Sequence, residues 1–211
     1  MHVEIWSDIA CPWCYVGKRR FEAALAGFAQ RAEVEVTWRS FELDPQAPRE
    51  RDGDHTEHLA AKYGMTIEDA AARHAQMTEM AAREGLELNF DRVRGGNTFD
   101  AHRLVHLGAA HGLQDATKER LLRAYFTDGE PVGDPEALAR AAADVLPEDE
   151  VRATLAGDRF AEDVREDERA AAALGITAVP FFVVNREIAV SGAQPPEVLQ
   201  ALLERGLPAL R

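Results

Sequence analysis

Cysteine is scarce in this sequence, which has only two in 211 residues. Two cysteines are too few for a fold built on several disulfides, and too few for a zinc site with four cysteine ligands. The two are Cys11 and Cys14, so both belong to one short motif. Their spacing therefore becomes the first feature to explain.

Long apolar runs and basic patches are also missing. No run approaches the roughly 20 apolar residues of a membrane helix, so we expect a soluble protein with no membrane partner. The chain has 24 basic and 37 acidic residues and a net charge of −13. This charge would repel phosphate backbones, and no compact Lys/Arg-rich cluster offsets it, so nucleic acid is not an expected partner.

The first residues lack the features of a secretory signal. Residues 1–8 contain Glu4, no basic n-region and no long apolar stretch, so we do not expect a signal peptide. The sequence accordingly predicts a cytoplasmic location, where thiols are mostly reduced. A disulfide in that compartment is more often catalytic or redox-sensing than structural.

Hydrophobic periodicity predicts a β-α-β unit in the first forty residues. Residues 3–6 form a short strand pattern, and residues 34–38 alternate strictly between apolar and polar side chains. Between them, Phe21, Leu25 and Phe28 share one face of a helix that follows Cys14. Two strands joined in this way normally run parallel with a right-handed crossover.

The rest of the chain divides into a helical block and a mixed tail. Residues 48–146 show no convincing strand, with helix starts at Thr66 and at Asp134 and helices expected over about 98–111 and 115–126. A charged helix ending at Gly175, a hairpin over 181–190 and a last helix over 197–205 follow. We predict an α/β domain of residues 1–46 and 147–211, with residues 47–146 as an all-helical insertion.

The Cys11-Pro12-Trp13-Cys14 motif lies between the first strand and the helix. Pro12 suits the first helical position, which makes Cys11 the expected N-cap, its sulfur facing the N–H groups of Trp13 and Cys14. Those donors and the helix end would stabilise a thiolate. Cys14, one turn inside, should be more buried and have the higher pKa. Cys11 is thus the predicted nucleophile and Cys14 the resolving thiol of a redox-active disulfide.

Other interpretations of the two cysteines remain open. A structural disulfide across so short a loop would contribute only about 2 kcal/mol. A zinc site would need two further ligands, and no histidine lies near the motif. Two unpaired core cysteines would make the spacing accidental. The placement of the motif between a strand and a helix favours the redox interpretation.

A second feature is Val179-Pro180, at the start of the fluent strand pattern 181–184. Proline at that place supplies no N–H, so neighbouring backbone groups are left free to pair with a bound chain. Alone, the feature would be an ordinary proline at a strand start. Together with the CxxC motif it predicts a substrate-docking loop.

These residues resemble a known family. The CxxC motif, the late Val179-Pro180 and the helical block between them are similar to the thioredoxin fold with the DsbA-type helical insertion. Residues 6–17 (WSDIACPWCYVG), 97–104 (NTFDAHRL) and 191–194 (SGAQ) resemble the FrnE-like branch of DsbA-type oxidoreductases. The resemblance covers essentially the whole chain.

The resemblance implies a protein-disulfide oxidoreductase or isomerase whose only redox centre is its own disulfide, with no metal and no other cofactor. It implies a cis Val179-Pro180 peptide that holds substrate through the Val179 backbone, and it places Asn97 and His102 in the active-site cleft. Trp13 is expected to contact substrate. The expected partners are protein or small-molecule thiols and disulfides, with glutathione as a possible co-substrate.

Relatives in the same branch have different chemistry. Kappa-class glutathione transferases and 2-hydroxychromene-2-carboxylate isomerase usually have serine at the first CxxC position, whereas Cys11 and Cys14 are both intact here, which favours thiol–disulfide exchange. A glutathione-dependent isomerase or transferase and a non-catalytic redox sensor remain alternatives. The dipeptide Pro12-Trp13 does not set the direction of exchange.

Weaker features have structural explanations. His102 and His106 are spaced i, i+4, but Arg103 stands where an HExxH motif has its acid, and no third metal ligand is evident. Asp8 is expected to cap local backbone N–H groups rather than to transfer protons. The basic run 18–20 is expected to form a solvated helix face.

Overall fold

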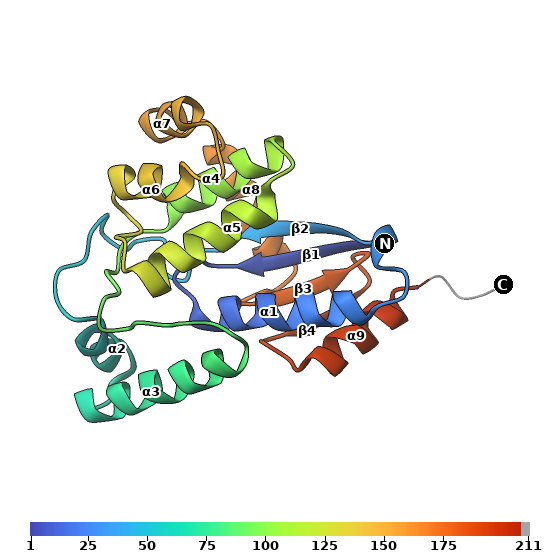
Figure 1. Ribbon diagram of the computed structural model, residues 1–211, viewed down its shortest axis with the longest axis horizontal. Coiled ribbons are helices and arrows are strands. Elements are labelled where there is room, and N and C mark those ends of the chain that lie inside the picture. Colours follow the sequence, from blue (N-terminus) through green and yellow to red (C-terminus); the bar gives the residue numbers. More distant parts are fainter. Residues whose placement is uncertain (208–211) are drawn as a thin grey trace.

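The computed structural model describes residues 1–207 and has one mixed sheet in that range. The strand order is β2-β1-β3-β4 (Figure 1). The strands are β1 (His2–Ser7), β2 (Glu35–Ser40), β3 (Phe181–Val184) and β4 (Ile188–Ser191). β1 and β2 are parallel, as the sequence predicts, and the other neighbours are antiparallel.

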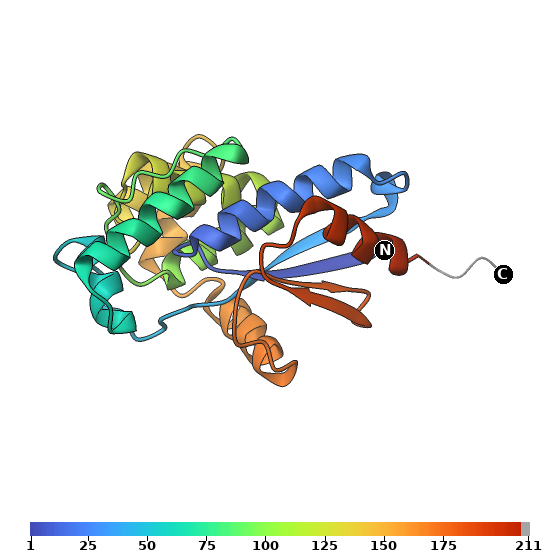
Figure 2. The same ribbon diagram turned by 90° about the horizontal axis from the view of Figure 1, so that it is seen from below.

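Side chains of the two central strands alternate between two apolar layers. Val3, Ile5 and Phe182 belong to the large core beneath α1 (Pro12–Gly27) and α9 (Pro196–Arg205). Trp6 and Val183 point to the other face, into a smaller core shared with α8 (Ala161–Ala173). Figure 2 shows α1 and α9 on one side of the sheet and α8 on the other. The sheet is therefore covered on both faces.

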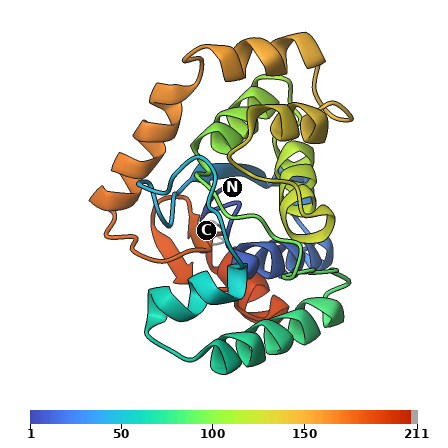
Figure 3. The same ribbon diagram turned by 90° about the vertical axis from the view of Figure 1, so that its left-hand side faces the viewer.

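Helices fill the long connection between β2 and β3. They are α2 (His55–Tyr63), α3 (Ile67–Arg83), α4 (Phe99–Ala110), α5 (Gln114–Arg123), a π-helical turn (Ala124–Asp128), α6 (Pro135–Ala142) and α7 (Glu148–Ala156), before α8. The predicted caps are present, since Thr66 accepts from the Asp69 N–H, and Asp134 accepts from two N–H groups of α6. Figure 3 shows the α2–α3 hairpin and the α4–α7 group on opposite sides of α1.

The α/β fold with a large helical insertion is confirmed. The boundaries at residues 46 and 147 stay a prediction, and positions 208–211 of the second segment lie outside the described residues. α7, which follows the predicted boundary, packs against α4 and α6. Across residues 1–207, no helix has both the length and the apolar content needed to cross a bilayer.

The basic run 18–20 does not form a solvated face, so that expectation is wrong. Lys18 is buried, and its Nζ lies 3.1 Å from Asp115 Oδ2 and 3.2 Å from Glu119 Oε2. Arg19 also pairs with Glu119, and Arg20 pairs with Glu84, the residue that follows α3. The cause is tertiary, because acids far along the chain face this turn of α1. The run links α1 to the helical insertion.

Candidate functional site

The two cysteines lie at the start of α1, shortly after β1. Cys11 is the N-cap residue with extended backbone angles (φ −105°, ψ 109°), and Pro12 opens the helix. The Cys14 N–H donates to the Cys11 carbonyl over 3.0 Å. Both are free thiols, 4% and 1% exposed for Cys11 and Cys14 respectively. Because β1 ends at Ser7, the motif lies at the carboxyl end of a central strand of the sheet.

The Cys11 sulfur does not accept the hydrogen bonds from helix N–H groups that the sequence led us to expect. Its side chain makes no capping hydrogen bond. The thiol instead donates to the Val179 carbonyl oxygen, at a Sγ–O distance of 3.7 Å. The nucleophile predicted from one end of the chain and the docking loop predicted from the other are thus in direct contact.

The Val179-Pro180 peptide is cis, as the family resemblance implies. Pro180 packs against Gly17, six residues after Cys11 on α1. A Cβ atom on Gly17 would lie 2.8 Å from Pro180 Cγ and 3.6 Å from Ala193 Cβ. Real Cβ contacts are longer than the first of these distances, so only glycine lets the loop lie so close to the helix.

Cys14 shares its buried environment with a lysine that sequence reasoning missed. Burial and the neighbouring Cys11 raise the pKa of Cys14, while the positive charge of Lys118 on α5 lowers it. Lys118 is 1% exposed, and its Nζ donates to the Ser7 carbonyl over 3.3 Å. Burial lowers the pKa of Lys118 itself to about 8. A buried ammonium group beside a buried thiol stabilises that thiol's ionised form.

A signal for Lys118 was present in the sequence. The buried residues of α5 include Leu121 and Leu122, which lie three and four residues after Lys118. A lysine on the apolar stripe of a helix is expected to be buried. Because lysine is almost never fully buried without a partner, such a position indicates that its charge acts on a neighbouring group.

Asp8 and His102 form a buried pair beneath the motif. His102 Nε2 lies 3.2 Å from Asp8 Oδ1, and the Leu43 N–H donates to Asp8 Oδ2 over 2.8 Å. Burial opposes ionisation of Asp8, but the hydrogen bonds from His102 and Leu43 outweigh it and lower the Asp8 pKa. Burial also lowers the pKa of His102, which keeps its ring neutral at pH 7. His102 is only 1% exposed and does not line the cavity that Asp8 borders beside Cys11.

Asn97 lies in the connection before α4 and has a structural set of partners. Its Nδ2 donates to Glu42 Oε1 over 3.2 Å and to the Pro45 carbonyl over 3.4 Å. Its Oδ1 accepts from the Phe99 N–H over 2.9 Å at the start of α4. Asn97 therefore ties the segment after β2 to α4, and like His102 it does not line the cavity described below.

Glu42, the partner of Asn97, is one of two carboxyl groups that share an arginine. Arg165 Nη1 lies 2.8 Å from Glu42 Oε2 and 2.6 Å from Glu168 Oε2. Within the described chain, Glu168 Oε1 is buried without a hydrogen-bond partner. A proton on one of the two carboxyl groups would satisfy that oxygen. Burial and the neighbouring Glu168 raise the pKa of Glu42 to about 7.

We expect Glu42→Gln to stabilise the protein at alkaline pH. The folded state holds the Glu42 proton more tightly than the unfolded chain does. Ionised Glu42 therefore lowers the free energy of unfolding progressively as pH rises from about 4.5, and the full loss is reached above about pH 7. At pH 8 the variant should gain about 1–2 kcal/mol in free energy of unfolding. At pH 4.5 it should gain almost nothing. Denaturant unfolding at both pH values measures this, with the exposed Glu35→Gln as control; equal effects of Glu42→Gln at both pH values would contradict it.

A cavity of about 660 Å³ opens beside Cys11. Of the predicted site residues, Cys11, Trp13 and Val179 line it, together with Asp8. Cys14 and Pro180 do not line it. Trp13 is 43% exposed at its rim, and its contact with substrate stays a prediction. The wall opposite the motif comes from α2 and α3, so the insertion supplies one side of this cavity.

Comparison with known proteins identifies the family. Residues 2–204 match the profile of the DSBA-like thioredoxin domain. The chain belongs to this family. This match confirms the resemblance to DsbA-type thiol–disulfide oxidoreductases seen in the sequence. Nowhere in residues 1–207 do three or more His, Cys, Asp or Glu side chains gather in a way that could hold a metal ion.

Several solved structures are similar to this chain over nearly its whole length. A probable DsbA oxidoreductase from Streptomyces coelicolor is 47% identical, with a TM-score of 0.94, over 100% of this chain and 93% of that one. The cytosolic disulfide reductase DsbM from Pseudomonas aeruginosa is 18% identical, with a TM-score of 0.65, over 97% and 98% of the two chains. A 2-hydroxychromene-2-carboxylate isomerase is 15% identical, with a TM-score of 0.68, over 97% and 95%. The last two show similarity of fold.

Proposed function

We propose that this DsbA-like protein exchanges disulfides through Cys11 and Cys14, with Cys11 as the nucleophile. The observation that carries the proposal is the placement of the only two cysteines of the chain. Cys11 lines the cavity and contacts Val179, whereas Cys14 is buried behind it next to Lys118. One sulfur is thus accessible to a substrate, and the other is accessible mainly to Cys11.

The reaction runs in two displacement steps. The Cys11 thiolate attacks one sulfur of a substrate disulfide, and the other substrate sulfur leaves as a thiolate that takes up a proton. Cys14 then loses its proton and attacks the Cys11 sulfur, which releases the substrate as a dithiol. The protein is left with a Cys11–Cys14 disulfide. Two molecules of a monothiol such as glutathione, or one dithiol, reduce this disulfide through a mixed disulfide and are themselves joined as a disulfide; the reverse sequence oxidises a dithiol substrate.

The proposal includes a cytoplasmic location and glutathione as a thiol that can complete the cycle. The supporting observations concern a protein of the same fold: DsbM of P. aeruginosa is described as cytosolic, and a structure of it contains glutathione. Both points are tested directly, by locating the protein in cell fractions and by cycling it with glutathione.

Trapping tests the assignment of the two cysteines. Cys14→Ala leaves Cys11 able to attack but removes the thiol that resolves the mixed disulfide. After addition of a disulfide-bonded protein, the variant should accumulate Cys11 mixed disulfides that dithiothreitol releases, whereas the wild type should not. Mass spectrometry under non-reducing conditions detects them. The double variant Cys11→Ser/Cys14→Ala is the control and should trap nothing.

Two results would contradict the proposal. If the Cys11→Ser variant still catalysed thiol–disulfide exchange, Cys11 would not be the nucleophile. Turnover of an electrophile with glutathione, unaffected by Cys14→Ala, would identify a glutathione transferase or isomerase instead.

A further inference from the structure

The cavity wall formed by α2 and α3 has an unusual distribution of charge. Both helices line the cavity with residues at helical spacing. From α2 these are His55, His58, Leu59, Lys62 and Tyr63, and from α3 they are Arg73, His74, Gln76, Met77 and Met80. None of these ten side chains is acidic. The acids of the two helices, Glu57, Glu68, Asp69 and Glu79, all lie outside the cavity lining.

Lys62 and Arg73 are the exposed cations of this wall. Neither makes an ion pair anywhere in residues 1–207, although acids outnumber bases in the chain. Two acids line the cavity elsewhere: Asp44 Oδ2 lies 2.7 Å from Arg51 Nη2, and the buried Asp8 is hydrogen-bonded to the neutral ring of His102. Arg51, Lys62 and Arg73 thus face two acids in the lining, so its net charge is positive, which favours an anionic guest.

The cavity rim carries large exposed apolar side chains. Trp13, Leu43 and Tyr63 all line the cavity and are all substantially exposed. Exposed apolar groups gathered at one place mark a binding surface. Because Val179 borders the same cavity, a guest can meet Cys11, the Val179 backbone, this apolar rim and the two cations at once.

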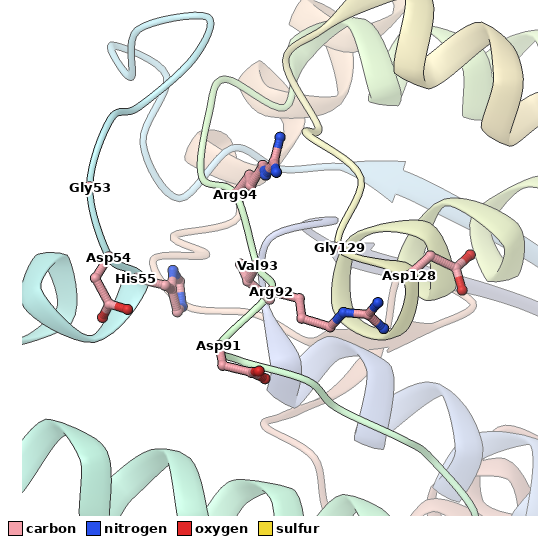
Figure 4. Close-up of a pocket in the computed structure, with 9 residues that line it drawn as sticks. All are labelled: Gly53, Asp54, His55, Asp91, Arg92, Val93, Arg94, Asp128 and Gly129. Atoms are coloured by element: carbon pink, nitrogen blue, oxygen red, sulfur yellow. The ribbon is translucent and has the colours of Figure 1, made fainter.

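A neighbouring cavity shows that unbalanced charge is not a general property of the surface. This second cavity, of about 530 Å³, shares His55 with the first. Its arginines, Arg92 and Arg94, are accompanied by three acids, and Figure 4 shows Arg92 extending toward Asp128. Acids and bases are mixed there, so the cavity lacks the positive excess of the first.

We propose that the α2–α3 wall selects protein substrates in which an acidic segment flanks the reacting cysteine. This inference rests on the proposed exchange function and names its substrate class. The substrate lies extended, with its disulfide at Cys11, apolar contacts to Trp13 and Tyr63, and carboxylates at Lys62 and Arg73. A peptide is favoured over a small thiol because the binding features extend from Val179 across the rim to two successive helices.

Three disulfide peptides of equal length test the inference. Asp, Gln or Lys residues flank the cysteine, and each exchange rate with the reduced wild-type protein is divided by the rate with dithiothreitol to correct for intrinsic reactivity. At low ionic strength the acidic peptide should react about tenfold faster than the lysine peptide, and the difference should shrink as salt is added. The variant Lys62→Glu/Arg73→Glu should reverse the order.

The control variant carries the same change of charge away from the cavity. Arg31→Glu/Arg83→Glu alters exposed residues outside the lining and should keep the preference for the acidic peptide. Equal corrected rates for the three peptides would overturn the inference while leaving the exchange function intact. Failure of all three to exchange would overturn the exchange function itself. Glutathione disulfide provides the last comparison. If it reacts as fast as the acidic peptide, and if its rate falls by the same factor in the Lys62→Glu/Arg73→Glu variant, the wall binds small anionic thiols and the peptide proposal is wrong.

Discussion

Replacing Lys118 by methionine is expected to slow resolution by Cys14 about tenfold at pH 7 while making the fold more stable. The ammonium group is buried and lowers the pKa of Cys14. Methionine fills a similar volume without the charge, so the Cys14 pKa rises further. If the Cys14 pKa rises by about one pH unit, the thiolate, which is the form that attacks the mixed disulfide, becomes about tenfold scarcer.

The pH dependence separates this effect from a structural one. If Lys118 acts through the ionisation of Cys14, the pH–rate profile for resolution should move to higher pH in the variant, and the rate should recover in alkaline solution. Stopped-flow measurement of mixed-disulfide decay across neutral and alkaline pH gives this profile. A profile of unchanged midpoint and lower amplitude would contradict the role.

The stability change follows from the same lysine. Its pKa is about 8 in the folded protein against an ordinary value of 10.5, so the folded state binds the proton less tightly than the unfolded chain. Charged Lys118 therefore lowers the free energy of unfolding. This loss of stability is complete below pH 8 and disappears as pH rises toward 10.5. Removing the charge should raise the free energy of unfolding by about 2–3 kcal/mol at pH 7, measured by denaturant unfolding.

Lys18 supplies the matched control. It is also buried, but three acids surround it and raise its pKa. The folded state therefore favours its charged form, and Lys18→Met should destabilise the protein at pH 7. The Cys14 pH–rate profile should stay where it is. Two buried lysines thus give opposite stability changes for one substitution.

Gly17→Val is expected to impair both folding and exchange. The added side chain would overlap the Pro180 ring, which packs 2.8 Å from the position of a Cβ atom. Overpacking of this kind costs about 1–3 kcal/mol. Relief requires the 179–180 loop to move away from α1, which would lengthen the 3.7 Å contact between Cys11 Sγ and the Val179 carbonyl. Denaturant unfolding and exchange rates measure the two effects.

A second glycine of the same helix provides the comparison. A Cβ atom on Gly27 would lie 3.6 Å from Gln200 Oε1, an ordinary contact. Gly27→Ala should leave exchange unchanged and leave stability unchanged or slightly higher, because alanine favours helix. Gly17→Ala should already slow exchange. Equal behaviour of the two alanine variants would show that close packing at Gly17 does not matter.

Local sequence signals predicted the elements that local forces form. The strands over 3–6 and 181–184, the helix opened by Pro12 and the caps at Thr66 and Asp134 depend on neighbours within a few residues, and all are present. The cysteine motif was also found in this way, because strand, motif and helix are consecutive.

Contacts between distant segments could not be predicted in the same way. The Cys11 thiol donates to a carbonyl 168 residues away and accepts no capping hydrogen bond from its own helix. The resemblance placed His102 in the cleft, but His102 on α4 is bonded to Asp8 and does not line the cavity. Lys18 was expected in solvent because its acidic partners on α5 lie about a hundred residues later. In each case the partner's position depends on how whole helices pack.

The position of Lys118 on α5 limits how freely the helical insertion can be exchanged between relatives. The segment that forms the cavity wall through α2 and α3 also carries the charge that acts on Cys14. A chimera that receives a foreign insertion for a new substrate preference would therefore also receive a new ionisation behaviour at its resolving thiol. Specificity and reactivity are inherited together in this architecture.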